Sequence, residues 1–272
     1  METADNKVFI TMFHKFSFKY RNKVIDSETM KSEKLVKLFT YLLMNHQRSL
    51  PSSELADMLW YFEDIDNPIG ALKNLVYRLR ALLKKEFGMS DFITTGKGAY
   101  SINPAYTISM DVSDFDICNN DLTNAQGNEA ELYQRLIQLY RGKFLSEIKG
   151  DHNILSKSAY YHSIYIGRVI EYANLLEENK EYAEMERLAR NAIEIDDLEE
   201  DLYEILIRAL YFQKQYKKAY EVYRSTTELL YEALGIKPSK SLQDLHNLIK
   251  KEIHEENVDI LEVQQELIEE EE

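Results

Sequence analysis

The first part of the chain alternates between apolar and polar positions in the way that β-strands do. Residues 8–13 and 16–20 are rich in β-branched and aromatic side chains, and residues 21–23 suit a hairpin turn. Residues 24–25 then form a short return strand. The pattern therefore predicts three short strands at the front of the chain.

The spacing of apolar residues then changes to three and four, which is the period of an amphipathic helix. A first stripe of this kind runs through residues 35–43. Ser52 or Ser53 can cap a second helix that carries apolar residues up to Trp60. Two helices therefore follow the strands.

The third predicted helix has clear signals at both ends. Pro68 suits a first helical turn, and Gly88 stops the helix after a run of inward-facing leucines. Behind it, residues 92–95 and 100–102 flank a tip with two glycines, which is typical of a β-hairpin. Three strands, three helices and a terminal hairpin predict an α+β unit.

The rear of the chain is helical from Leu132 onward, behind a connector around residues 111–115. Within residues 170–226 the sequence repeats with a period of 34, so that Tyr182 corresponds to Tyr216. This is the tetratricopeptide period, in which each helix–turn–helix unit buries its apolar face by stacking on its neighbours. A last helix carries apolar residues at helical spacing, namely Leu242, Leu245, Leu248 and Ile249. The rear therefore predicts an all-α repeat domain.

Length and composition fit two ordinary globular domains. The chain has 272 residues, of which 44% are hydrophobic and 29% charged, and domains usually contain ~100–200 residues. No apolar run approaches the roughly 18–20 residues of a membrane span. The N-terminus shows no secretory signal, and the lone Cys118 cannot form a disulfide within the chain. These features predict a cytoplasmic protein without a membrane partner.

The net charge of −14 is unevenly distributed along the chain. Residues 1–105 hold 15 Lys and Arg against 12 Asp and Glu, whereas the remainder holds 18 against 35. A mildly basic front and a strongly acidic rear predict different partners for the two parts. The rear is expected to repel phosphate backbones, and the front is suited to bind them.

The polar face of the predicted helix over residues 68–87 is basic. With 3.6 residues per turn, one stripe runs along the helix and two further residues flank it. The stripe consists of Lys73, Tyr77, Arg80 and Lys84, and the flanking residues are Asn74 and Arg78. Arg and Lys reach phosphates or guanine edges, Asn pairs with adenine, and Tyr donates to a phosphate. The pattern favours the major groove of DNA, with an ordinary solvated helix face as the alternative.

Several stretches, taken in their order, resemble a family of regulators. Residues 59–60, 71–80 and the hairpin that ends in Tyr100 resemble the OmpR-type winged helix. Four later segments resemble the bacterial transcriptional activation domain, namely residues 139–145, 192–196, 219–223 and 234–239. Together they resemble the SARP-type regulators over residues 7–250.

The resemblance implies that residues 68–87 form a recognition helix and residues 92–102 a wing. At the matching positions, the groove would be faced by Lys73, Asn74, Tyr77 and Arg78, and the backbone or minor groove would be touched by Thr94 and Lys97. It also implies binding to repeated promoter sites, often as a dimer, and recruitment of RNA polymerase. The wing departs from the family pattern because Gly96 stands where an arginine is common.

The predicted organisation has three parts. An OmpR-type winged-helix DNA-binding domain covers residues 1–105, an activation domain with tetratricopeptide-like helices covers 106–255, and an acidic tail covers 256–272. We therefore predict a sequence-specific transcription activator whose partners are double-stranded DNA, RNA polymerase and a second copy of itself. The alternative is a helical-repeat adaptor or signal-sensing protein whose winged helix mediates protein contacts.

Competing chemistry is sparse. Asp64 and Asp66 faintly suggest a calcium loop, but Leu75 stands where the loop needs its glutamate. The six histidines show no metal-ligand spacing, and the glycines of the hairpin tip lack the rest of a phosphate-binding loop. No nucleophile–base pair is evident. The sequence predicts no enzyme, no metal and no cofactor.

Many of the 19 tyrosines lie in residues 160–231. They fill the core of the repeats or, alternatively, line a concave groove for a peptide, a partner helix or a small ligand.

Overall fold

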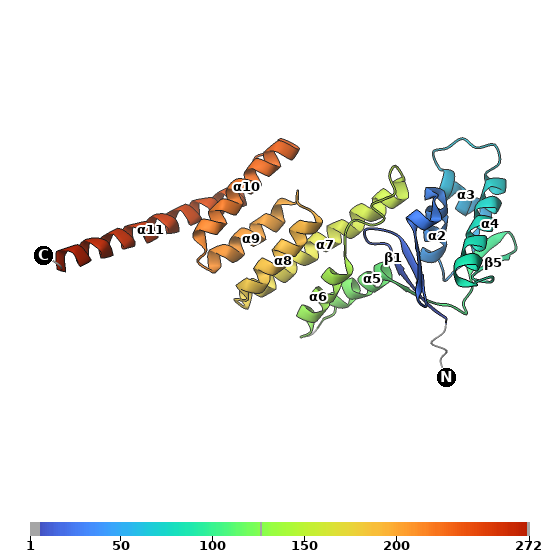
Figure 1. The fold of residues 1–272 in the computed structure, drawn as a ribbon, viewed down its shortest axis with the longest axis horizontal. Helices are drawn as coiled ribbons and strands as arrows, with labels where there is room; N and C mark the ends of the chain where they lie inside the picture. The colour runs from blue at the N-terminus through green and yellow to red at the C-terminus, as the bar shows by residue number, and fades with distance from the viewer. Residues whose placement is uncertain (1–5, 126, 271–272) are drawn as a thin grey trace. The chain divides into compact units, whose positions relative to one another are not determined.

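The computed structural model describes residues 6–125 and 127–270. The chain forms two compact units, of which the first ends at Ser163 and the second begins at Ile164. The predicted fold class is confirmed: mixed strands and helices come first, and paired helices follow (Figure 1). The three predicted domains, over residues 1–105, 106–255 and 256–272, stay a prediction.

A four-stranded sheet opens the first unit. The strands β1 (Lys7–Thr11), β2 (Ser17–Tyr20) and β3 (Lys23–Asp26) form an antiparallel meander, as predicted. A further strand, β7 (Thr107–Met110), pairs with β1 in parallel and completes the order β3-β2-β1-β7. The connector was not expected to contribute a strand, so the sheet extends beyond its prediction.

Four helices follow the meander. They are α1 (Ser27–Met30), α2 (Glu33–Met44), α3 (Ser52–Trp60) and α4 (Pro68–Phe87). Their common core is aromatic: the ring of Phe18 lies 5.0 Å from that of Phe39 and 5.3 Å from that of Phe92, between centroids. Such pairs stabilise a core beyond the area that they bury.

The ends of these helices correct one prediction and confirm two. Neither Ser52 nor Ser53 caps α3, because Pro51 precedes the helix and Ser52 is already its first residue. The side chain of Asn67 caps α4 by accepting a hydrogen bond from the backbone N–H of Gly70 at 2.8 Å. Pro68 opens α4 as predicted, and Gly88 ends it in the left-handed conformation that glycine tolerates best.

The predicted hairpin consists of β5 (Ile93–Gly96) and β6 (Ala99–Ile102). A two-residue strand, β4 (Leu50–Pro51), pairs with β6, so that a second sheet has the order β4-β6-β5. At the tip, Lys97 and Gly98 both have positive φ values of 51° and 77°. Two successive residues of this kind form the tight turn whose twist matches paired strands.

The segment expected to be a connector is helical. Helix α5 (Asp111–Leu122) follows β7 directly, and α6 (Glu129–Leu139) and the start of α7 (His152–Glu178) complete the first unit. The buried carboxylate of Asp111 accepts hydrogen bonds from the backbone N–H groups of Met12 and Phe13 at 2.9 and 3.0 Å. Burial raises the pKa of Asp111 to about 6, against the opposing effect of these bonds. The side chain therefore joins α5 to the end of β1.

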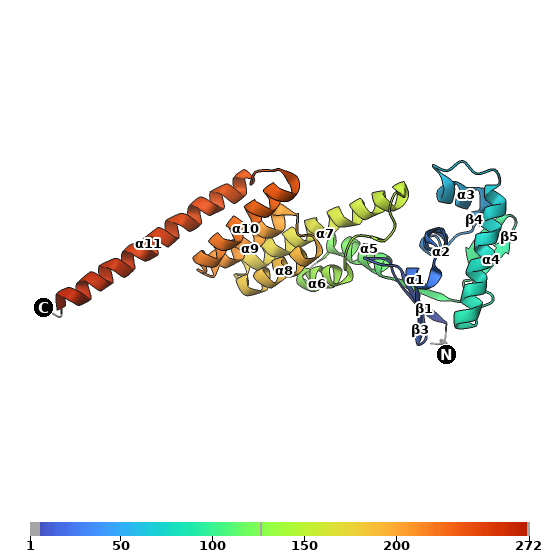
Figure 2. The same ribbon diagram turned by 45° about the horizontal axis from the view of Figure 1, so that its top comes forward.

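The second unit consists of paired helices. After the rest of α7 come α8 (Tyr182–Ile195), α9 (Glu200–Phe212), α10 (Tyr216–Leu234) and α11 (Lys240–Glu270). Helices α8, α9 and α10 pack in sequence side by side (Figure 2). Tyr182 and Tyr216 are the first residues of α8 and α10, so the period of 34 coincides with the helical repeat.

The last helix departs from its predicted apolar stripe. Leu242 and Ile249 are fully buried, but Leu248 is 48% exposed, so it does not share their inward face. The backbone of α11 is helical as far as Glu270, and this includes most of the predicted acidic tail. The side chains of residues 256–270, and residues 271–272 altogether, lie outside the description. No helix within the described ranges is both long and apolar enough to cross a membrane.

Candidate nucleic-acid interface

Helix α4 separates apolar from basic side chains. The residues that face the core of the first unit are buried, and they are Leu72, Leu75, Val76, Leu79 and Leu83. They pack the helix against α2 and α3, and burying such side chains contributes about 1.5–3 kcal/mol each. This packing turns the opposite face of α4 to solvent.

Five of the predicted contact residues lie on the solvent face of α4. They are Lys73, Asn74, Tyr77, Arg78 and Lys84. Tyr77 is 73% exposed. Within residues 6–125 and 127–255, whose side chains the structure describes, no ion pair engages Lys73, Arg78 or Lys84. The structure thus brings these residues together as an unneutralised basic surface, which we call the α4 face.

Arg80 differs from the other members of the predicted stripe. Its side chain is only partly exposed and turns toward the hairpin, where Nε and Nη2 donate to the carbonyl oxygen of Ile93 at 3.1 and 2.9 Å. Nη2 also donates to the hydroxyl of Thr95 at 2.6 Å, and the guanidinium lies 5.9 Å from the ring centre of Tyr100. A DNA contact by Arg80 stays a prediction. The hydrogen-bond partners of its guanidinium in the structure are Ile93 and Thr95.

The hairpin presents the two predicted wing residues to solvent. Thr94 and Lys97 are both exposed, and the hydroxyl of Thr94 donates to the carbonyl of Ser101 at 3.3 Å. Lys97 stands at the turn itself. Alone among the predicted residues of the hairpin, it carries a charge at the tip.

Sequence reasoning missed four residues that hold the hairpin. Ser52 donates to the carbonyl of Gly98 through both its backbone N–H, at 2.9 Å, and its hydroxyl, at 2.7 Å. The hydroxyls of Ser49 and Ser101 lie 2.8 Å apart, and Thr95 accepts from Arg80. The only signal for Ser52 was its position before a helix, and this signal pointed to a cap.

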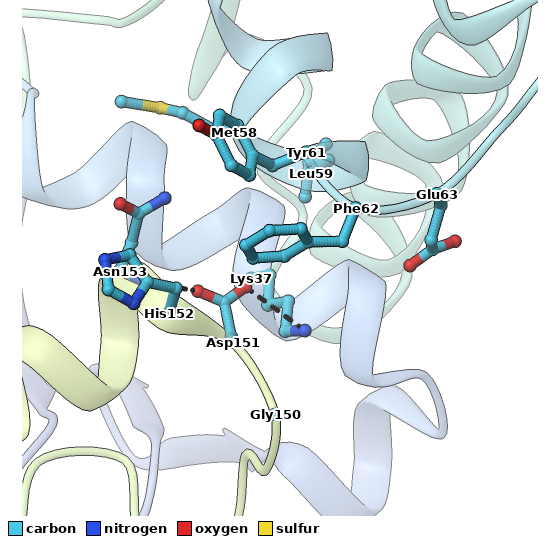
Figure 3. Close-up of a pocket in the computed structure, with 10 residues that line it drawn as sticks. All are labelled: Lys37, Met58, Leu59, Tyr61, Phe62, Glu63, Gly150, Asp151, His152 and Asn153. Atoms are coloured by element: carbon cyan, nitrogen blue, oxygen red, sulfur yellow. Dashed lines mark hydrogen bonds and ion pairs between the residues drawn. The ribbon is translucent and has the colours of Figure 1, made fainter.

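A hollow of about 230 Å³ is the other candidate site in the first unit (Figure 3). It lies between the end of α3, with Tyr61 and Phe62, and the first residues of α7. Its polar floor is the pair of Lys37 and Asp151, whose charged atoms are 3.2 Å apart. The figure shows the ring of Phe62 over this pair.

The charges in this hollow are already satisfied. Burial opposes the charge of Lys37, but hydrogen bonds to Glu33 and Asp151 hold its pKa above the ordinary value. The carboxylate of Asp151 also accepts from the hydroxyl of Tyr41 at 3.3 Å and from two backbone N–H groups at the start of α7. Burial, with the Asp151 charge, raises the pKa of Tyr41. The cluster fastens α7 to α2, and it holds no free nucleophile.

A scan against models of protein families matches residues 119–250 to the bacterial transcriptional activator domain. These residues are therefore similar to a bacterial transcriptional activator domain. They lie inside the region of residues 106–255 that the resemblance assigned to it. The match agrees with the prediction of a regulator that is not an enzyme.

Mycobacterium tuberculosis EmbR, solved in complex with a low affinity phosphopeptide, is similar in fold. The TM-score is 0.63 at 16% sequence identity, and the match covers 90% of this chain. The chain spans 65% of the EmbR chain. Together, the activator domain and this fold confirm the predicted resemblance to SARP-type regulators. Among curated proteins, no match is found.

The tyrosines of residues 160–231 differ widely in burial. Tyr161, Tyr165 and Tyr172 are buried, whereas Tyr160 and Tyr231 are more than half exposed. Among the residues whose side chains are described, no group of three His, Cys, Asp or Glu is arranged to hold a metal ion. The α4 face, which precedes residues 119–250 in the sequence, combines basic side chains with an amide and a phenol.

Proposed function

We propose that this protein is a sequence-specific DNA-binding transcription regulator that acts in the cytoplasm. Helix α4 enters the major groove, and the hairpin of β5 and β6 is the wing that contacts the backbone or the minor groove. The protein binds repeated promoter sites as a dimer. It activates transcription by contacting RNA polymerase through or beside its helical domain.

The observation that carries the proposal is the unneutralised α4 face. An acid one turn away can offset an exposed Lys or Arg within a helix, but Lys73, Arg78 and Lys84 have no such partner in the described part of the chain. Phosphates supply the missing charge, because each one neutralised by Lys or Arg releases a bound counterion and so favours binding. Asn74 and Tyr77 add hydrogen-bonding groups between the cations.

Specificity is expected from the centre of this face. Asn can make two hydrogen bonds to adenine, and Arg two to guanine, in the major groove. Asn74 and Arg78 lie four residues apart, so they face the same side one turn from each other. Lys84 lies further along the helix, where a phosphate contact fits a long flexible cation.

The dimer and the polymerase contact rest on the activator domain. Residues 106–272 carry 18 basic against 35 acidic residues, so this part of the chain repels DNA and is suited to bind protein. An adaptor or signal-sensing protein whose winged helix binds protein is the competing function. The unneutralised α4 face speaks against it, since the cores of protein interfaces are depleted in lysine.

The salt dependence of DNA binding tests the proposal. Genomic fragments retained by the full-length chain are recovered, and the affinity for the tightest one is measured between 50 and 200 mM salt. If the front neutralises ~4–6 phosphates, the log–log slope is about −3.6 to −5.4. A flat slope, or no retained fragment, would contradict the proposal and favour the adaptor.

A further inference from the structure

The side chain of Arg80 ties the wing to helix α4 by hydrogen bonds. The Nε–H and Nη2–H groups of Arg80 donate three hydrogen bonds of 2.6–3.1 Å to Ile93 and Thr95 of strand β5. The guanidinium also lies near the ring of Tyr100 on β6. Because a guanidinium is planar and its donors point in fixed directions, such a fork sets orientation as well as distance.

The wing is tied to helix α3 at a second place. The carbonyl of Gly98, at the turn, accepts both the backbone N–H and the hydroxyl of Ser52. Strands β4 and β6 pair beside this contact, Leu50 with Tyr100 and Pro51 with Ala99. The turn that presents Lys97 is thus held from the α3 side, and the strand before it is held from the α4 side.

We propose that Arg80 is a positioning residue, which fixes the wing relative to α4 so that Lys97 and the α4 face reach one duplex together. This inference rests on the proposed function. A wing that is held before binding loses little conformational freedom when it meets DNA, and this increases affinity without a new contact. Arg80 acts through Lys97, whereas Lys73 and Arg78 act directly.

Charge-conserving and charge-removing variants separate this role from a direct phosphate contact. Arg80→Lys keeps the cation but loses the planar fork, and Arg80→Gln loses both. We expect both variants to bind the selected fragment about tenfold more weakly, which corresponds to about 1.4 kcal/mol. Wild-type affinity in Arg80→Lys overturns the inference, because charge alone would then suffice.

A double-mutant cycle shows whether Arg80 acts through the wing tip. Lys97→Ala weakens binding in the wild-type background and has little further effect in Arg80→Gln, since the tip is already misplaced. Coupled sites depart from additivity in this way, and independent sites do not. Lys73→Ala, on the α4 face, is the matched control, and its effect stays the same in both backgrounds. Full additivity of Arg80→Gln with Lys97→Ala, or no effect of Lys97→Ala in the wild type, overturns the inference.

Two controls keep the outcomes distinct. Thermal unfolding of each variant establishes that it folds, because a loss of fold would reduce the effect of every other substitution, including Lys73→Ala. The wild-type chain is measured first on the same fragment. If the wild type binds no fragment, the proposed function fails. If it binds and the cycle is additive, only the role of Arg80 fails.

Discussion

Helices α4 and α8 handle exposed charge in opposite ways. On α8, Arg187 pairs with Glu184 at 2.5 Å and Arg190 pairs with Glu186 at 2.8 Å. On α4, the only ion pair between described residues joins the neighbours Lys85 and Glu86. Both helices bury a continuous apolar face, so their difference lies entirely on the solvent side.

The difference distinguishes a helix surface whose charges are neutralised within the protein from one whose charges are not. Acids and bases that alternate at three- and four-residue spacing neutralise each other, and they keep a surface soluble without attracting an ion. A run of cations without acids keeps its field, which is strongest where no counter-charge is fixed nearby. By this criterion the repeats present an ordinary surface on α8, whereas the α4 face is suited to a polyanion.

The largest expected effect follows from removing the cations of the α4 face. Lys73→Ala and Arg78→Ala should each weaken binding to the selected fragment by about 1–3 kcal/mol if base edges are read. Arg78→Ala should also relax the preference at one base position, whereas loss of a phosphate contact weakens all sequences alike. Binding of each variant is measured at one fixed salt concentration.

Arg187→Ala on α8 is the matched control for these variants. It removes an arginine that is also exposed and whose charge Glu184 already offsets. We expect its DNA affinity to equal that of the wild type. Equal losses from α4 and α8 would break the comparison, because general charge would then account for binding. Wild-type affinity in both α4 variants would refute the recognition-helix assignment.

Local signals made α4 predictable from the sequence. Pro68 and Gly88 mark its ends through backbone properties that no distant residue alters, and the leucine spacing identifies its buried face. The exposure of Lys73 and Arg78 follows from that spacing alone. The predicted residues 68–87 therefore coincide with the helix.

Features that depend on distant partners were not predictable in the same way. Strand β7 is four residues long and is held by β1, whose partner positions lie about a hundred residues earlier. Arg80 has the spacing of a solvent-facing residue, but the carbonyl of Ile93 draws it to the wing. Ser52 has the residue type of a helix cap, and the wing turn takes its hydroxyl instead. In each case the deciding group is absent from the local pattern.

A smaller effect is expected from the hydroxyl of Tyr77. Tyr77 is 73% exposed, so little of its side chain packs within the protein. Tyr77→Phe should weaken DNA binding by about threefold to tenfold, as for the loss of one hydrogen bond of ~1 kcal/mol. Tyr231→Phe is the matched control, since this tyrosine of α10 is 65% exposed and carries the same hydroxyl. A loss in Tyr231→Phe of the same size would place DNA on the repeats as well.

The smallest effect concerns the ion pairs of the repeats. Arg190→Gln keeps helix propensity and removes the partner of Glu186, so we expect the free energy of unfolding to fall by about 0.2–0.5 kcal/mol. Burial opposes the charge of Glu186, but its hydrogen bonds with Gln213 and Arg190 hold its pKa below 4.5. A lowered pKa stabilises the fold fully above the unfolded value, and this stabilisation is lost as the pH falls through the lower folded pKa. The difference between variant and wild type should therefore be present at pH 7 and disappear at a pH well below 4.5. Denaturant unfolding at the two pH values measures it, with DNA affinity unchanged at pH 7. If Arg190→Gln instead altered DNA binding, α8 would also contribute to that binding. Ion pairing on a helix surface would then no longer distinguish α8 from the DNA-binding surface of α4.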